Sequence, residues 1–576
     1  MRPLLQSSMG YLPRRPPPYN PGMDTDSGVI KSNLIDLDRR CIYAASVRWN
    51  EGRITSVAVL GPADPTLDYL LPGFVDAHLH IESTMLPPAE FGRMGARQGT
   101  VAAVTDPHEI ANILGLEGVH YMAEDARHSP IRLFCGAPAC VPATQYETAG
   151  AELTARHVQR LLDEGSAGHL AEVMDFPAVL ERAPEIMAKI DIARTRGRRV
   201  DGHAPGLTGD AAARYASAGV DNDHECATLE KARDKLNAGQ WIAIREGSAA
   251  RSFEALHPLI ASHPQRLMFC TDDLHPDDLA RGHIDRTARR AIAAGHDPFD
   301  VLRIACTNPV RHYALPIGQL RVGERMDAIS VDDPARLNVL TTWSGGVRVA
   351  SRGVSESPHR PSSRINRFNA RTLTAGTLHE ALPTGNPDDP ALTIRVINCR
   401  DGALDTHETR HPPRWSGNRA VPDPEADILM LAVLNRYRPT RPAAAFIKGF
   451  GLRDGAIAGS IAHDSHNVIA VGTSATRVAE AINQVVDMSG GIAATGARTG
   501  DALPLPIAGL MSDADGDTVA RRHEALVSQA RALGTPLQAP FMTLSFMALL
   551  VIPALKLSDR GLFDGERFAL VPVLTH

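Results

Sequence analysis

The chain has 576 residues, which exceeds the size that one hydrophobic core serves, so we expect two or three domains. Hydrophobic residues make up 43% and charged residues 22%, an ordinary globular composition. The net charge of -6 gives no sign of a nucleic-acid or membrane-surface partner and suits a protein that acts on a small molecule. The seven cysteines are sparse and form no Cys-x-x-Cys pair, which favours a reducing, cytoplasmic location.

No segment of the sequence predicts a membrane anchor. Residues 1–30 contain many prolines and no continuous apolar run, which predicts a disordered or atypical lead-in rather than a signal peptide. The most apolar later segment, residues 543–557, is too short to cross a bilayer and contains Pro553. This segment fits either a core or an interface between copies, and we expect a homo-oligomer in the form of a dimer.

Residues 70–315 repeat one pattern, in which a short apolar run ends in polar residues and a helix-like stretch follows. Residues 212–219 and 284–297, for example, have helical spacing. There are eight such runs. Eight strand–helix units predict a (β/α)8 TIM-like barrel, in which catalytic side chains lie at the C-terminal ends of the strands.

The segments on both sides of this region alternate like strands. We expect residues 31–69 and 316–365 to pair into a small β-sandwich domain. Residues 355–364 are rich in serine and proline and are typical of a linker. In residues 393–576, strands and helices alternate without a repeat, which predicts a C-terminal α/β domain.

His78 and His80 end the first apolar run. Side chains at positions i and i+2 of a strand share a face, so the two imidazoles point into one space. Imidazole is a common ligand of zinc, manganese and iron. The pair alone is a weak signal, because two half-exposed histidines on a loop have the same spacing.

Four more residues end later apolar runs and strengthen the metal interpretation: Glu172, His203, His224 and Asp272. In a barrel, all six would converge on one mouth, where four imidazoles and two carboxylates suit two divalent cations with Glu172 between them. Two metals that share a water would provide a hydroxide nucleophile, and Asp272 could carry its proton to the leaving group. Asp273 should face away and make a structural hydrogen bond.

Several long motifs are typical of one enzyme family. They include PGFVDAHLHIEST, TDPHEIANILG, DGHAPGLTG and TDDLHPDDL in the first half, and KGFGLRDGAIAGSIAHDSHNVIAVG and LPLPIAGLMSD in the second. From about Leu70 to the end, the sequence resembles the adenine deaminase family of the amidohydrolase superfamily. In that family a glutamate stands where many relatives carry a carbamylated lysine, and Glu172 matches it.

The resemblance implies hydrolysis of adenine to hypoxanthine and ammonia, in purine salvage. It also implies two divalent metal ions, with manganese as the expected metal and iron or zinc as alternatives. The implied metal ligands are His78, His80, Glu172, His203, His224 and Asp272.

Attack at C6 of the purine places negative charge on the ring nitrogens, so an acid is needed near N1. Glu82 and Glu109 are the candidates for this catalytic role, and Asp106 and His108 are candidates for substrate binding. Asp106 could instead cap a helix, with Glu109 three residues later completing a capping box.

Further candidates for substrate contact follow the last two runs. Arg245, Glu246 and Ser248 follow the seventh run, where a salt-bridge cluster is the alternative interpretation. His275 lies close to the end of the eighth run. The family usually has an arginine before this histidine, whereas this chain has Leu274, so a cation is missing there.

His463 and His466 belong to the segment HDSHN in the C-terminal part. We weigh three interpretations of this segment: a lid or interface that lines the barrel mouth, a turn with local hydrogen bonds, and a second metal site. As a whole, the sequence leaves two rival functions open. One is an amidohydrolase that acts on another aminopurine or a cyclic amide, and the other is a non-catalytic metal-binding homologue.

Overall fold

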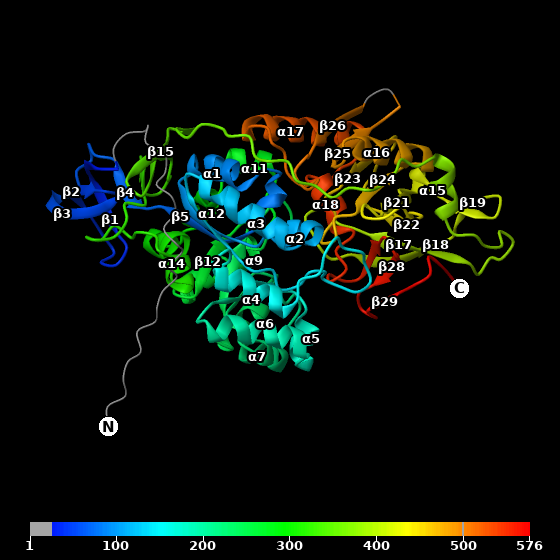
Figure 1. Cartoon of the computed structure of the whole chain (residues 1–576), viewed down its shortest axis with the longest axis horizontal. Coiled ribbons are helices and arrows are strands. Elements are labelled where there is room, and N and C mark those ends of the chain that lie inside the picture. The colour runs from blue at the N-terminus through cyan, green and yellow to red at the C-terminus, as the bar shows by residue number, and fades with distance from the viewer. Residues whose placement is uncertain (1–25, 498–499) are drawn as a thin grey trace.

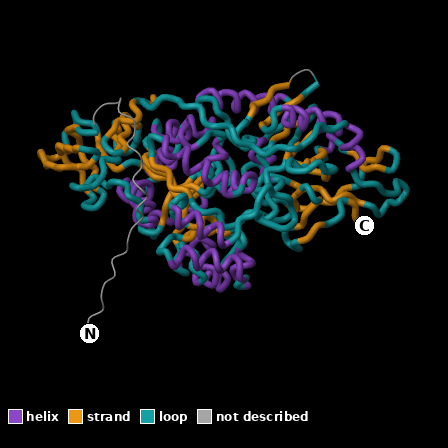
Figure 2. Tube along the Cα trace, viewed as in Figure 1, coloured by secondary structure: helices purple, strands orange, loops and turns teal. Residues whose placement is uncertain are grey.

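The computed structural model describes residues 26–497 and 500–576. Most of the predicted lead-in, residues 1–30, lies outside the described residues, and strand β1 begins at Gly28. Along the long axis of the molecule, a small region of strands is followed by a central region and then by the C-terminal region (Figure 1). Helices surround the strands of the central region (Figure 2).

The two segments that flank the central region form one eight-stranded sheet in the order β16-β15-β14-β13-β4-β1-β2-β3. Its strands are β1 Gly28–Asp36, β2 Cys41–Asn50, β3 Arg53–Pro62, β4 Tyr69–Pro72, β13 Ala328–Val331, β14 Val339–Ser344, β15 Val347–Ser351 and β16 Val354–Ser355. Strand β4 joins the two segments, because it pairs with β1 on one side and β13 on the other.

This sheet curls over its own core. Trp49 of β2 and Trp343 of β14 meet with ring centroids 6.4 Å apart, although β2 and β14 would lie about 19 Å apart in a flat sheet with three strands between them. The predicted β-sandwich is therefore one continuous, curled sheet in its hydrogen bonding rather than two separate sheets.

Each of the eight predicted runs of the central region contains a strand. The strands are β5 Phe74–Leu79, β6 Thr100–Thr105, β7 Arg132–Cys135, β8 Leu170–Val173, β9 Val200–Gly202, β10 Asn222–Asp223, β11 Trp241–Arg245 and β12 Leu267–Cys270. All of their pairings are parallel. Isolated parallel bridges join Ala137 to Leu170 and Leu79 to Asp272, the second of which connects the first strand with the end of the last.

Helices follow most of these strands. The longer ones are α1 Pro88–Ala96, α2 His108–Leu114, α3 Leu116–Asp125, α4 Ala155–Glu164, α6 Pro184–Thr195, α7 Gly209–Ser217, α8 Leu229–Asn237, α11 Pro276–Arg281 and α12 Ile284–Ala293. Helices α7 and α12 lie in the two stretches where the spacing predicts helices. Helix α12 buries Ile284, Ala288 and Ala291, which share one helical face.

A nine-stranded sheet forms the C-terminal region, in the order β18-β17-β22-β21-β24-β23-β25-β26, with β30 beside β17. Its strands are β17 Thr393–Asn398, β18 His407–His411, β21 Leu429–Leu434, β22 Ala443–Lys448, β23 Ala456–Gly459, β24 Val468–Gly472, β25 Gly491–Thr495, β26 Gly500–Pro504 and β30 Leu574–Thr575. Helix α16, Ala475–Asp487, packs Val478 and Ile482 against one face of this sheet.

The opposite face of the C-terminal sheet packs toward the central region. Leu431 of β21 and Ile457 of β23 share one apolar cluster with Ile110 and Ile113 of α2. Helices α17, Gly516–Ala532, and α18, Pro540–Phe546, belong to the same cluster. The apolar segment 543–557 therefore contributes to the core. Among the described residues, no helix has both the length and the apolar character that crossing a membrane requires.

Candidate metal centre and substrate pocket

His80 follows directly on β5, and its orientation is fixed by a backbone contact. Its Nδ1 lies 3.0 Å from the carbonyl oxygen of Asp106, so Nδ1–H can donate there and Nε2 points into the interior. This Nε2 is 3.7 Å from Glu172 Oε1 and 3.3 Å from Asp272 Oδ1. The position of His80 at the end of β5 therefore places its Nε2 next to the carboxylates of Glu172 and Asp272.

Glu172 of β8 lies at the centre of the group. Its Oε1 faces His80, while its Oε2 is 3.0 Å from His203 Nδ1, 3.0 Å from His224 Nε2 and 3.7 Å from His78 Nε2. The six residues predicted as ligands are all buried and lie around this carboxylate. The two oxygens of Glu172 face different histidines, so this carboxylate connects the histidines of the group.

Two buried imidazole nitrogens of this group, His78 Nε2 and His203 Nε2, make no hydrogen bond. Buried polar atoms are nearly always paired, because an unpaired one costs free energy. Ligand atoms of His78, His224 and Asp272 lie within 4.8 Å of one another, as do those of Glu172, His203 and His224. These donors suit zinc, manganese or iron, so the residues fit a centre for divalent cations.

Burial and mutual charge shift the pKa values of the group strongly. Burial, with the neighbouring His224, lowers the pKa of His78 to about 3. Burial opposes the charged forms of His224 and Glu172 as well, but their partners prevail: Asp272 and Glu172 raise the pKa of His224 to about 9, and His203 and other histidines hold the pKa of Glu172 well below its usual range. Without a cation, protons on histidines therefore balance the carboxylates, and a bound cation would replace them.

Asp272 adopts a left-handed backbone conformation, with φ of 58°, which non-glycine residues adopt at a cost. Its Oδ2 lies 2.7 Å from Nη1 of Arg245, at the end of β11. The same guanidinium pairs with Asp273 at 3.1 Å and with Glu225. Arg245 therefore lies in the site as predicted, where it holds carboxylates in place.

Asp106 supports the centre through its side chain. Its Oδ1 accepts a hydrogen bond from the His108 N–H at 3.0 Å, and its Oδ2 accepts one from the Glu172 N–H at 3.2 Å. The capping box considered with Glu109 does not form, because the Glu109 carboxylate accepts from Ser83 Oγ instead. His108 lines the pocket, and its Nδ1 is 3.5 Å from Glu172 Oε1.

Glu82 and Glu109, the two predicted acids, are buried behind the pocket wall. Glu82 Oε1 accepts from the Ile110 N–H, and burial raises the pKa of Glu82 to about 7. Burial and the neighbouring Glu82 also raise the pKa of Glu109 well above its usual range. His463 lines the pocket and lies next to Glu109, with its Nδ1 3.7 Å from Glu109 Oε1.

Five residues predicted to contact substrate do not line the pocket of the described chain: Asp106, Glu246, Ser248, His275 and His466. Glu246 points away from Arg245, as neighbours in a strand do, and pairs with Arg290. Ser248 donates to Asp278 Oδ2 at 2.6 Å and accepts from the His275 N–H at 2.8 Å. The His275 ring packs on His523, 4.3 Å away between centroids.

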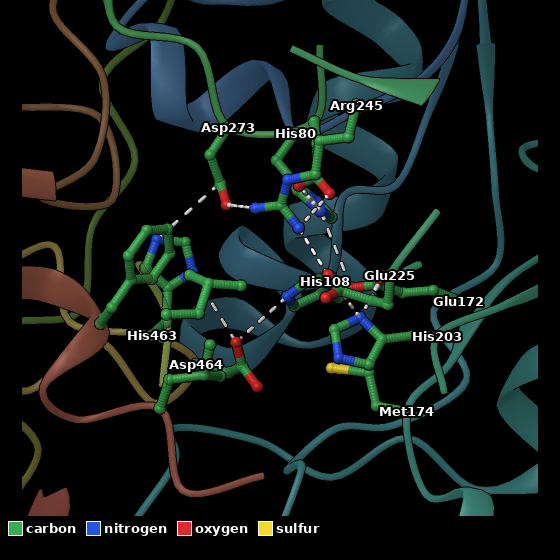
Figure 3. A pocket seen from close by; sticks show the side chains of 14 residues that line it. His80, His108, Glu172, Met174, His203, Glu225, Arg245, Asp273, His463 and Asp464 are labelled. Atoms are coloured by element: carbon green, nitrogen blue, oxygen red, sulfur yellow. Dashed lines mark hydrogen bonds and ion pairs between the residues drawn. The ribbon is translucent and has the colours of Figure 1, made fainter. Parts of the chain in front are cut away.

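The C-terminal region supplies one wall of the pocket. His463 and Asp464 face His108 across it, and Asp464 Oδ1 is 3.4 Å from His108 Nε2 (Figure 3). Phe546 and Leu549 form an apolar part of the wall. These contacts favour the interpretation of HDSHN as a segment that lines the mouth.

The HDSHN segment is held firmly against the central region. Asn467 Nδ2 donates to the Thr148 carbonyl oxygen at 3.0 Å, and the Ser465 hydroxyl donates to Glu147. His466, the last candidate of this segment, does not line the pocket of the described chain but lies 4.0 Å from Glu109 Oε2. These hydrogen bonds fix the wall to the central region on one side, and the C-terminal region packs against its other side.

Family models match both halves of the chain. The amidohydrolase family matches residues 69–349, and the adenine deaminase C-terminal domain matches residues 403–569. Similar proteins, each called adenine deaminase, come from Salinibacter ruber (51% identical over 94% of this chain and 98% of that protein), Sulfurovum sp. (47%, over 94% and 99%) and Methanosarcina barkeri (45%, over 95% and 99%). The chain belongs to the adenine deaminase family. The sequence-based resemblance is thereby confirmed, and the amidohydrolase match implies a TIM-barrel-type fold for the central region.

For this member of the adenine deaminase family, sequence reasoning missed several pocket residues. Glu225 lies 3.7 Å from His203 Nδ1 and 3.6 Å from His224 Nε2. Glu225 directly follows the predicted ligand His224 in the sequence, and this position could have indicated that Glu225 belongs to the site. Asp273, expected to face away, lines the pocket, but it also makes the expected structural hydrogen bond by accepting from Ser83 Oγ at 2.6 Å. Phe546 and Leu549 carry no local signal, because only the packing of the C-terminal region brings them there.

Proposed function

We propose that this chain is an adenine deaminase that hydrolyses adenine to hypoxanthine and ammonia and so serves purine salvage. The observation that carries the proposal is the convergence of the other five candidate ligands on Glu172, beneath a pocket with one wall made by residues of the C-terminal region. A pocket of this kind, with an apolar wall and a few convergent polar groups, suits a flat heteroaromatic ring.

The architecture we propose is the one expected from the sequence. The eight parallel strands of residues 70–315 would form a closed (β/α)8 barrel, with residues 31–69 and 316–365 as a separate small β domain and residues 393–576 as the C-terminal domain. The backbone hydrogen bonds between His78, His80 and Asp272 support closure, because they link the first strand to the end of the last.

Two divalent ions, with manganese as the expected metal and iron or zinc as alternatives, would be held by the six candidate ligands. Glu172 would contact both ions. Such ions lower the pKa of a bound water toward neutrality and so supply the nucleophile of a hydrolase.

The protein's own side chains would orient the ring and move protons. Arg245 keeps the Asp272 carboxylate ionised, and the pKa of Asp272 stays well below its usual range despite burial. An ionised Asp272 can accept a proton from the attacking water and return it to the departing amine at C6. Phe546 and Leu549 would cover the ring face, and Glu82 and Glu109, with His463 between Glu109 and the pocket, would supply the proton for the ring nitrogen.

The test is ammonia release by the purified protein, loaded with manganese, from adenine and from a panel of other aminopurines and cyclic amides. We expect adenine to have the highest kcat/KM. Activity on another member of the panel with adenine inert would favour the first rival function. Well under one metal per chain, without activation by added manganese, would favour the non-catalytic homologue. The expected dimer and cytoplasmic location are tested by light scattering and by cell fractionation.

A further inference from the structure

A second group of ligand-type side chains lies at the junction of the central and C-terminal regions. It consists of His275 and Asp277 at the start of α11 and His523 of α17. The Nδ1 of His523 is 2.8 Å from Asp277 Oδ1, and the rings of His275 and His523 are 4.3 Å apart. One ligand atom from each residue fits within 4.8 Å of the other two.

The burial of this group leaves one ring nitrogen without a partner. His523 is 1% exposed and His275 is 5% exposed. His523 Nδ1 faces Asp277 Oδ1, whereas Nε2 of the same buried ring makes no hydrogen bond. A ring nitrogen buried in this way loses the hydrogen bond of water and gains none in return, which costs free energy unless another ligand takes its place.

We propose that His275, Asp277 and His523 bind one divalent cation of the zinc type, separate from the centre around Glu172. Two imidazoles and a carboxylate are a common ligand set for zinc, with a water at the fourth position. Bond lengths of about 2.1 Å place tetrahedral ligand atoms about 3.4 Å apart, which lies within the spacing that these residues allow.

The surroundings of the group suit this role. Nη1 of Arg281 binds Asp277 Oδ2 at 2.9 Å and so leaves Oδ1 directed at His523. This pairing orients a ligand as partners outside a metal's ligand shell do. A cation here would tie α17 to α11, which follows Asp272 and Asp273 in the chain.

The experiment compares the wild-type protein with His523→Leu and Asp277→Asn. Glu524→Gln is the matched control, since it breaks the exposed ion pair between Glu524 and Arg281 next to the site but leaves the three ligands. After zinc saturation and dialysis, we expect the wild type and E524Q to carry one more zinc per chain than H523L or D277N. Zinc should raise the Tm of the metal-free wild type by more than that of either ligand variant.

Crystals of the zinc-loaded wild type give the decisive readout, because anomalous scattering locates ions independently of folding defects in variants. We expect a peak between His275, Asp277 and His523. No peak there, or equal zinc content in wild type and H523L, would overturn the proposal. Peaks near Glu172 are judged separately, so this result does not depend on whether the protein deaminates adenine.

Discussion

Arg245 is the residue on which the acidic side of the pocket depends most. It is 4% exposed and touches Asp272, Asp273 and Glu225. Buried charges are tolerated when they are paired, but removing one partner leaves the others uncompensated. One guanidinium here compensates three carboxylates, one of which is a candidate metal ligand and proton carrier.

Replacing Arg245 with methionine should therefore impair both stability and catalysis. We expect R245M to lose about 3–5 kcal/mol of unfolding free energy, and kcat/KM for adenine to fall about 10- to 100-fold because a group that orients a metal ligand is lost. Urea unfolding and steady-state kinetics measure the two effects. R245K should recover much of the stability and less of the activity, because lysine lacks the planar fork that binds two carboxylates. Wild-type kinetics in R245M would contradict the assignment.

Asp464 gives a test of the C-terminal wall without disturbing the candidate ligands. It reaches His108 and the pocket, and it contacts none of the six ligand side chains in the described structure. We expect D464A to reduce kcat/KM for adenine by about tenfold or more, with metal content unchanged by atomic absorption. Loss of metal together with activity would show instead that Asp464 acts on the centre itself.

At the scale of elements, the strands were predictable and the residues beyond them less so. Parallel strands buried on both faces are continuous apolar runs that end in polar residues, and all eight runs contain a strand. The alternation within a strand also explains why Arg245 points inward and Glu246 outward. Beyond the strand ends the alternation no longer applies, because the conformation of the loop decides where each side chain points. His275 turns to α17 and Asp273 turns into the pocket, contrary to prediction.

Strand β27, Leu555–Ser558, holds another part of the wall through a buried lysine. Lys556 Nζ donates to the Leu404 carbonyl at 2.6 Å and to the Phe546 carbonyl at 3.0 Å, and both of these residues line the pocket. Burial lowers the pKa of Lys556 to about 7 from its usual 10.5. The lysine therefore links the position of α18 to pH.

This lowered pKa predicts how stability depends on pH. Between pH 7 and 10.5, the folded protein holds Lys556 neutral while the unfolded chain binds a proton there. Unfolding takes up a proton in this window, so the free energy of unfolding should gain up to about 1.4 kcal/mol per pH unit as pH rises. Below pH 7 both states are protonated and the contribution is flat. Urea titrations at several pH values should show a smaller slope for K556M, and equal slopes would refute the assignment.

For the whole molecule, the main feature is that the central and C-terminal regions share one core. The cluster that includes Ile110 and Ile113 of α2 also includes Leu431, Ile457 and Leu544 of the C-terminal region. The sequence predicted both regions from their separate patterns. The packing of the two regions against each other could not be predicted. An apolar strand face indicates that the face is buried, but it does not identify the element that packs against it. This shared core also places His463 and Phe546 at the pocket.

A shared core predicts that the two regions unfold together. Leu544 is 1% exposed within it, so L544A should cost about 2–5 kcal/mol and move the unfolding of both regions to lower temperature in one calorimetric transition. V59A is the matched control, since Val59 is 61% exposed on β3, and should change stability by less than about 0.5 kcal/mol. With the other three tryptophans replaced by phenylalanine, the fluorescence of Trp241 on β11 reports on the central region. If its signal kept the wild-type midpoint in L544A while helix content fell earlier, the two regions would be independent and the pocket would depend on a separable domain.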